Sequence, residues 1–220
     1  MHRLLAKNFK VGPLWEKTYI SHKDMYKHAP PGAIVDRLLE GAIPPFSKDN
    51  VFFVVMVKHP YSWLVSRMRL AKKTIEGNEG EALDRLKEYN LKYREWLRFL
   101  FCKPSCSILV RYEDLVKNYK APLGILQAAF NLEMTGDSLE NVRGVMRKNN
   151  TEDKGQLFDV NYYLKKFYLE EYPEQFKRPV YRAIDWGVVR ELGYRDALRK
   201  DIWGSSDGDE LFDGFAPPQF

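Results

Sequence analysis

The sequence predicts an α/β protein whose sheet contains parallel strands, and three observations point to that class. A continuous run of apolar and β-branched residues over 51–57 is typical of a strand that is covered on both faces. A second, shorter apolar stretch lies at 107–110. An amphipathic helical pattern follows each stretch. Because strands that alternate with helices tend to pair in parallel, we expect a sheet with helices packed against it.

A helix is predicted directly after the first strand. Pro60 suits the first turn of a helix, where its missing N–H leaves no hydrogen bond unmade. Apolar residues then recur at the spacing i, i+3, i+4 and i+7 and form one stripe, which consists of Tyr61, Leu64, Val65 and Met68. A strand, a tight turn and a helix therefore follow one another from residue 51 onward.

A second helix, of about 20 residues, is predicted from near Ala82, after a loop at 77–80. Its buried side is traced by Leu83, Leu86, Tyr93, Trp96, Leu97 and Leu100. The strand at 107–110 follows it. Pro122 then opens a helix that carries Leu123, Leu126 and Phe130 on one face.

The last third of the chain reads as helical. Helices are predicted over 161–172 and over 179–192, and Gly193 is placed to cap the second of them. The segment 204–220 is rich in Gly, Ser, Asp and Pro, which favours a mobile end over a strap docked by its aromatic residues. We therefore expect one domain over 1–200 and an acidic tail over 201–220.

The formal net charge of +5 at pH 7 hides an uneven distribution. The last 20 residues contain five acidic and no basic residues, which leaves 35 basic and 25 acidic residues, a charge of +10, in the first 200. Such a surplus fits an anionic ligand, although it also fits plain solubility. We expect no nucleic-acid partner, because no basic and aromatic recognition module is present. The longest apolar run is too short to span a bilayer, so no membrane partner is expected.

A metal site is not expected from the cysteines. Cys102 and Cys106 have no further Cys or His at the spacing that a structural zinc site requires.

A phosphate site is predicted where the first strand ends. In open α/β sheets, ligands bind beyond the carboxyl ends of the strands, and a helix N-terminus attracts anions. Lys58 ends the strand, and Ser62, Ser66 and Arg69 fall together on the helix, away from its apolar stripe. A cation, hydroxyls and a guanidinium suit a dianionic phosphate. An ordinary solvated helix face would have the same spacing, and the spacing leaves both interpretations open.

Residues 54–66 resemble the 3′-phosphate-binding segment of the sulfotransferases that use 3′-phosphoadenosine 5′-phosphosulfate. In that family an apolar strand ends in Arg-Asn/Asp-Pro and a Ser follows at a fixed distance, so Lys58 matches the Arg and Ser66 the Ser. Residues 108–115 are similar to the family's strand that ends in Arg-Tyr-Glu-Asp-Leu. Short matches near Tyr162, Asp185 and Gly193 resemble the carboxy-terminal part of bacterial and carbohydrate-type members.

This resemblance implies a three-layer sandwich, with a central, mostly parallel sheet between helices, similar to that of the P-loop NTPases. It implies an enzyme that transfers a sulfuryl group from 3′-phosphoadenosine 5′-phosphosulfate to a hydroxyl or amine of a glycan or small molecule, with adenosine 3′,5′-bisphosphate as product. Separately from the resemblance, we expect a cytoplasmic protein. His28 matches the family's general base, with His22 as a rival, and Tyr112 matches a contact with the adenosine. Because charge stabilisation and positioning dominate such transfers, no metal is expected.

One part of the family pattern is missing from the sequence. Residues 1–9 look like the helix that follows the family's 5′-phosphosulfate loop, but neither that loop nor a G-x-x-x-x-G-K-[ST] replacement occurs. Three interpretations follow. The sulfotransferase-like domain is N-terminally incomplete, or the chain is a catalytically degenerate member that serves as a nucleotide-binding or interaction module, or it completes its site in another way.

Overall fold

The computed structural model describes residues 1–11, 51–140 and 160–203. The chain divides into two units. Unit 1 consists of Met1–Met56 and Arg98–Leu164, and unit 2 consists of Val57–Leu97 and Lys165–Phe220.

Unit 1 contains the sheet. Strand β1 (Phe53–Val57) pairs with β2 (Ser107–Arg111) in a two-stranded parallel sheet. The pairing begins where the backbone N–H of Phe53 donates to the carbonyl of Cys106 at 2.7 Å. Both predicted strands are confirmed, and so is the α/β class at this level, since helices flank the pair.

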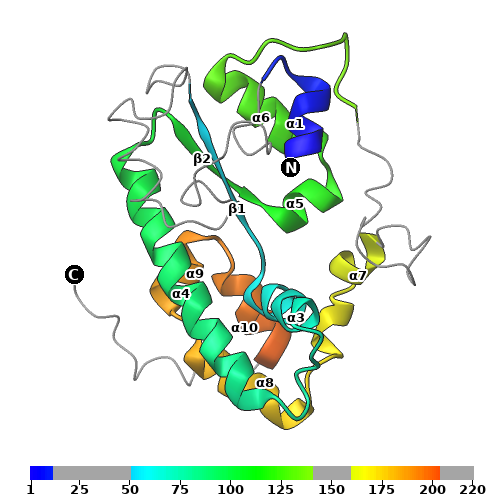
Figure 1. Cartoon of the computed structure of the whole chain (residues 1–220), viewed down its shortest axis with the longest axis vertical. Coiled ribbons are helices and arrows are strands. Elements are labelled where there is room, and N and C mark those ends of the chain that lie inside the picture. The colour runs from blue at the N-terminus through cyan, green and yellow to red at the C-terminus, as the bar shows by residue number, and fades with distance from the viewer. Residues whose placement is uncertain (12–50, 141–159, 204–220) are drawn as a thin grey trace. The chain divides into compact units, whose positions relative to one another are not determined.

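The core of unit 1 joins the sheet to two helices, α1 (His2–Asn8) and α6 (Lys120–Phe130), which lie side by side in Figure 1. Its buried side chains come from all three elements and from the residue after α1; they are Leu4, Phe9, Val110, Leu123 and Leu126. The sequence predicts Pro122 as the first residue of this helix, but α6 begins two residues earlier, so Pro122 lies in its first turn. The predicted burial of Leu123 and Leu126 is confirmed, because both are 0% exposed.

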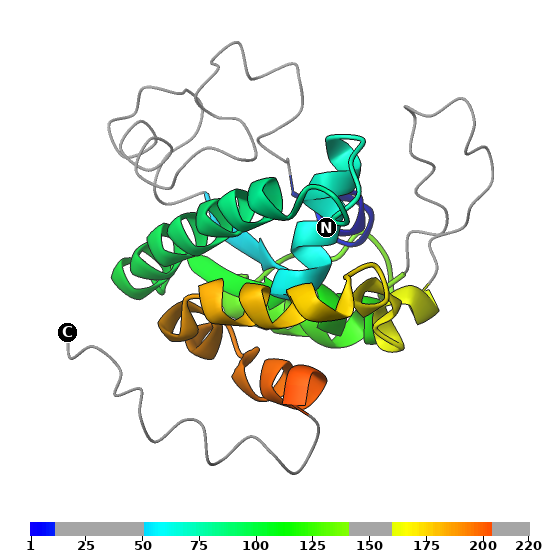
Figure 2. The same cartoon turned by 90° about the horizontal axis from the view of Figure 1, so that it is seen from below.

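Unit 2 begins with α3 (Pro60–Leu70), whose first residue is the predicted proline. The four side chains of the predicted apolar stripe are each 2% exposed or less, so this helix and its buried face are confirmed. The next helix, α4 (Glu79–Cys102), runs without interruption in Figure 2 and begins three residues before Ala82. Of its predicted stripe, Leu86, Tyr93 and Leu97 are buried, whereas Leu83, Trp96 and Leu100 are only partly buried.

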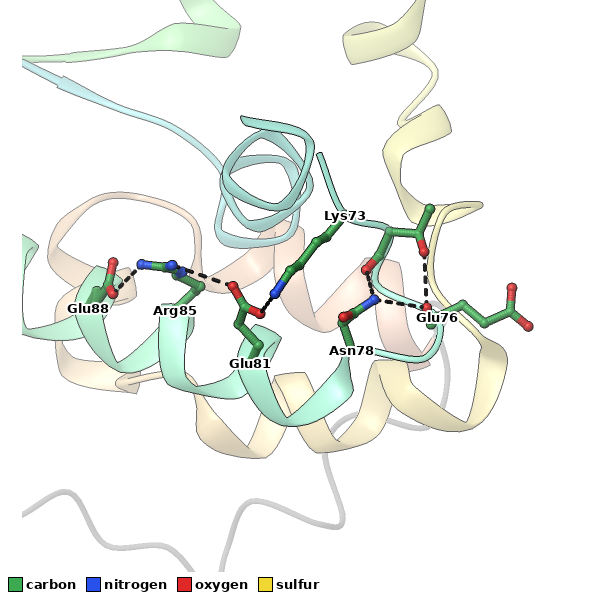
Figure 3. Close-up of polar contacts among 7 residues, drawn as sticks. Lys73, Glu76, Asn78, Glu81, Arg85 and Glu88 are labelled. Atoms are coloured by element: carbon green, nitrogen blue, oxygen red, sulfur yellow. Dashed lines mark hydrogen bonds and ion pairs between the residues drawn. The ribbon is translucent and has the colours of Figure 1, made fainter. Parts of the chain in front are cut away.

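The loop between α3 and α4 is held by local hydrogen bonds and charges, as Figure 3 shows. The Asn78 side-chain amide donates to the carbonyls of Thr74 and Glu76, at 3.1 and 3.4 Å. Gly77 has φ +76°, a conformation that a side chain would disfavour. At the start of α4, Glu81 pairs with Lys73 at 2.5 Å and with Arg85 at 3.4 Å. The loop is therefore fastened to the first turn of α4.

The C-terminal part contains more breaks than the sequence predicts. Residues 161–172 are divided between α7 (Val160–Leu164) and the 3₁₀ helix η2 (Phe167–Leu169), because Lys166 between them has φ +57°. The second predicted helix is wrong as a single element. It begins earlier as α8 (Glu174–Ala183), with Pro179 inside it, and a new helix, α9 (Trp186–Glu191), starts where Asp185 caps it.

The predicted glycine cap is confirmed. Gly193 has φ +76° and follows Leu192, the C-cap residue of α9, and the N–H of Tyr194 closes the helix end by donating to the carbonyl of Val189 at 2.8 Å. Helix α10 (Arg195–Trp203) follows and includes Asp201, which the sequence assigned to the tail. None of the helices in the described ranges is long and apolar enough to cross a membrane.

Candidate phosphate-binding site

Lys58 lies between β1 and α3, and its backbone is fixed from the side of α4. The hydroxyl of Tyr89 donates to the Lys58 carbonyl at 3.0 Å. Tyr89 is 0% exposed, and its ring meets the edge of Trp63 at a centroid distance of 5.2 Å. Because the buried Tyr89 hydroxyl donates its hydrogen bond to this carbonyl, it fixes the position of the Lys58 backbone.

The Lys58 ammonium reaches the hydroxyl of Ser66. The Nζ atom donates to Oγ at 2.6 Å, and the same Oγ donates to the Ser62 carbonyl at 2.9 Å. A hydroxyl has one proton and an ammonium has three. Because Ser66 already gives its proton to the backbone, Lys58 is the principal donor of the pair, and Ser66 holds the ammonium in place.

The sequence predicts that the Ser62 hydroxyl faces a ligand, but in this structure Ser62 takes part in the site through its backbone carbonyl. The residue is 1% exposed, and within the described ranges its Oγ has no hydrogen-bond partner. Its carbonyl, in contrast, accepts from Ser66. In this structure Ser62 therefore acts through its backbone, and contact between its hydroxyl and a phosphate stays a prediction.

Arg69 is paired with a carboxylate. Its Nε donates to Glu171 Oε2 at 3.2 Å and its Nη2 to Glu171 Oε1 at 2.5 Å, a side-on fork. Glu171 lies two residues after η2, and the two side chains are 54% and 31% exposed. The predicted clamp of Arg69 on a phosphate would use the donors that this carboxylate accepts from, and it stays a prediction.

His59, next to Lys58, is buried rather than part of a surface. It is 2% exposed, and the rings of Tyr61, Tyr168 and Tyr194 lie 5.5 to 5.9 Å from its own. Burial, reinforced by the charge of Lys166, lowers the pKa of His59 to about 3. The imidazole is therefore neutral at pH 7.

A buried carboxylate accompanies this imidazole. The Nε2 atom of His59 lies 3.6 Å from Oδ2 of Asp201, and Asp201 forms an ion pair with Lys166 through its other oxygen. Burial raises the pKa of Asp201, while the hydrogen bond and charge of Lys166 act in the opposite direction. These contacts fasten α10 to the start of α3 within unit 2.

Tyr112 belongs to unit 1, where it begins α5 (Tyr112–Lys117). Its ring meets the edge of Tyr163 at 5.0 Å, in the contact between α5 and α7. The preceding residue, Arg111, pairs with Asp114 at 2.7 Å. Tyr112 is half-buried against this neighbour, and its contact with an adenosine stays a prediction.

The structure thus brings together two of the predicted residues, Lys58 and Ser66, with Ser62 joined through its carbonyl. His28 and His22 lie outside the described residues. Sequence reasoning missed Tyr89 and Glu171. Tyr89 follows Leu86 at helical spacing, so periodicity could have found its burial, whereas nothing in the sequence links Glu171 to a helix 102 residues earlier.

Comparison with protein-family models, with curated proteins and with solved structures gave no match. The functional argument therefore depends on the residues themselves.

Proposed function

We propose that the chain binds the 3′-phosphate of adenosine 3′,5′-bisphosphate with Lys58 and Ser66 as ligands, and that it acts as a sulfotransferase using 3′-phosphoadenosine 5′-phosphosulfate. The observation that carries this proposal is the 2.6 Å contact between the ammonium and the hydroxyl. The two groups come from a strand end and from the second turn of the following helix, which is where the resemblance places the phosphate ligands.

The local electrostatics support an anion at this position. Lys58 supplies the cation, and α3 is an 11-residue helix whose N-terminus follows directly. The first turn of a helix presents backbone N–H groups and a positive dipole end. The neighbouring His59 contributes no charge to this site, because its buried imidazole is neutral and packs against the tyrosine cluster.

The finer fold is part of the proposal. The parallel pair β1–β2 with helices beside it is compatible with a larger, mostly parallel sheet between two helical layers. In such a sheet the Lys58 turn would lie at the edge where ligands bind. We extend the proposal to a cytoplasmic protein with a glycan or small-molecule acceptor.

The proposed reaction moves one sulfuryl group. The bond between sulfur and the bridging oxygen of the donor breaks, and a bond forms between sulfur and the acceptor oxygen. The acceptor proton goes to His28, which the resemblance assigns as general base, and adenosine 3′,5′-bisphosphate leaves. The part of Lys58 and Ser66 is to position the nucleotide, which matters because orientation and charge stabilisation dominate such transfers.

Titration calorimetry with adenosine 3′,5′-bisphosphate tests the binding site. Arg offers phosphate a planar, two-donor fork where Lys offers a point charge, so Lys58→Arg should tighten binding. Ser66→Ala should weaken binding, because the ammonium loses the group that holds it. Lys87→Arg and Ser105→Ala, at exposed positions, serve as controls. Unchanged affinity in both Lys58→Arg and Ser66→Ala would remove this assignment.

A sulfate-transfer assay separates the enzyme from a nucleotide-binding module of the same fold. Binding itself is detected by thermal shift, because a ligand at 100 times its Kd adds about 2.7 kcal/mol to stability. Stabilisation together with transfer to an acceptor supports the enzyme. Stabilisation without transfer supports the module, and the catalytic half of the proposal then fails.

A further inference from the structure

Arg69 and Glu171 make a contact that resembles the way in which arginine holds a phosphate. Two nitrogens on one side of the guanidinium, Nε and Nη2, face the two carboxylate oxygens at 3.2 and 2.5 Å. Carboxylates and phosphates both accept two parallel hydrogen bonds from arginine, so they compete for the same donors. Glu171 therefore stands where an anionic ligand of Arg69 would stand.

The carboxylate is presented by an anchored segment. The residue after it, Tyr172, is 4% exposed, and its hydroxyl donates to the Tyr61 carbonyl at 2.7 Å. The ring of Tyr172 also meets the edge of Tyr61 at 4.9 Å, and η2 packs against α3. Because these contacts fix the backbone beside Glu171, the carboxylate returns to Arg69 at little cost in conformational entropy.

The pair lies next to the proposed phosphate ligands along α3. Ser66 and Arg69 are three residues apart on α3, and side chains at that spacing are neighbours on a helix surface. Lys58 donates to Ser66, so the ammonium, the hydroxyl and the guanidinium follow one another along one face. A carboxylate at the end of this row withdraws one of its two cations from the ligand.

We propose that Glu171 lowers the affinity of the proposed Lys58–Ser66 phosphate site by acting as a resident anion on Arg69. This inference rests on the proposed nucleotide site. When a 3′-phosphate enters, it takes the Arg69 donors only by displacing the carboxylate. Both side chains are partly exposed, so displacing the carboxylate costs little free energy. The ion pair therefore weakens phosphate binding without preventing it.

The test compares Glu171→Gln with the native protein. Titration calorimetry is carried out with adenosine 3′,5′-bisphosphate and with adenosine 5′-monophosphate, which lacks the 3′-phosphate. An exposed ion pair of this kind contributes little free energy. Glu171→Gln should therefore tighten binding of the bisphosphate about two- to five-fold and leave the affinity for the monophosphate unchanged. The control is Glu174→Gln, which removes the same charge from the same segment, where Glu174 pairs with Lys177. It should alter neither affinity.

Arg69→Gln shows whether the effect passes through the guanidinium. In the native background it should weaken bisphosphate binding, because the Glu171 carboxylate then lies near the phosphate without its cation, and in the Glu171→Gln background it should cancel the gain. The inference is overturned if Glu171→Gln leaves the preference for the bisphosphate unchanged while the native protein shows that preference. If neither the native protein nor any variant prefers the bisphosphate, the proposed site itself fails, and the inference fails with it.

Discussion

His59 is a titratable side chain enclosed by three tyrosine rings and a buried carboxylate. Its pKa of about 3 in the folded protein lies below the value of about 6.5 that an unfolded histidine has. The unfolded chain therefore takes up a proton first as the pH falls. The stabilisation that follows from a neutral His59 is complete above pH 6.5 and is lost as the pH falls toward 3.

We predict that His59 lowers the free energy of unfolding by about 2 kcal/mol between pH 7 and pH 5. Asp201 acts in the opposite sense, because its raised pKa stabilises the fold as it becomes protonated. Removing the imidazole with His59→Asn should flatten the acid side of the stability curve measured by urea unfolding. The imidazole NMR signal of His59 is identified by its absence from the spectrum of His59→Asn. In the native protein, its chemical shift should stay constant between pH 8 and 5. A midpoint near 6.5 would show that the imidazole is exposed.

At the same scale, the sequence predicted one contact of the site and missed another. Lys58 and Ser66 are eight residues apart, across one strand end and two helical turns, so their meeting follows from local geometry. Arg69 and Glu171 are 102 residues apart. Their pairing depends on how η2 packs against α3, which local patterns do not encode.

Among the elements, α4 supports the break between α8 and α9 through one side chain. The Asn90 amide donates to the Ala183 carbonyl at 2.8 Å, and its oxygen accepts from the backbone N–H of Asp185 at 3.1 Å. Arg94, one turn further on, pairs with the Asp185 carboxylate. The backbone groups that a continuous helix would have satisfied are satisfied here by α4.

Asn90→Ala should therefore destabilise the protein by about 2 kcal/mol, because it leaves a donor and an acceptor without partners. Asn90→Asp keeps the acceptor but places a carboxylate oxygen against the Ala183 carbonyl, so it should destabilise the protein at least as much as Asn90→Ala. The neighbouring Leu91 is 60% exposed, and Leu91→Ala should change stability by less than about 0.5 kcal/mol. Chemical denaturation measures all three, and equal values for Asn90→Ala and Leu91→Ala would contradict this role.

At the scale of elements, local sequence patterns predict some helices, whereas others depend on packing. The stripe of α3 was predictable because four apolar residues at helical spacing face one core. The division at Lys166 and the continuation of α8 through Pro179 were not predictable, because a positive φ and a proline inside a helix are locally unfavourable. In each case neighbouring contacts compensate: Lys166 pairs with Asp201, and Phe176 and Val180 of α8 are buried.

For the whole molecule, the sequence predicted the α/β class, and the described residues confirm it with two parallel strands and helices beside them. The phosphate site at the end of β1 stays a prediction. The larger three-layer sheet belongs to the proposal, as does the general base, since His28 lies outside the described residues. Because the comparisons gave no match, the proposed function depends on the Lys58–Ser66 contact.

The most direct measurement is the ratio of the affinities for adenosine 3′,5′-bisphosphate and adenosine 5′-monophosphate, determined by calorimetry for the native protein and for Lys58→Gln. The two ligands differ only in the phosphate that Lys58 is proposed to hold. A charge-assisted hydrogen bond supports a preference of about ten-fold or more for the bisphosphate in the native protein. We predict that Lys58→Gln removes this preference. The same ratio in both proteins would contradict a phosphate site at Lys58.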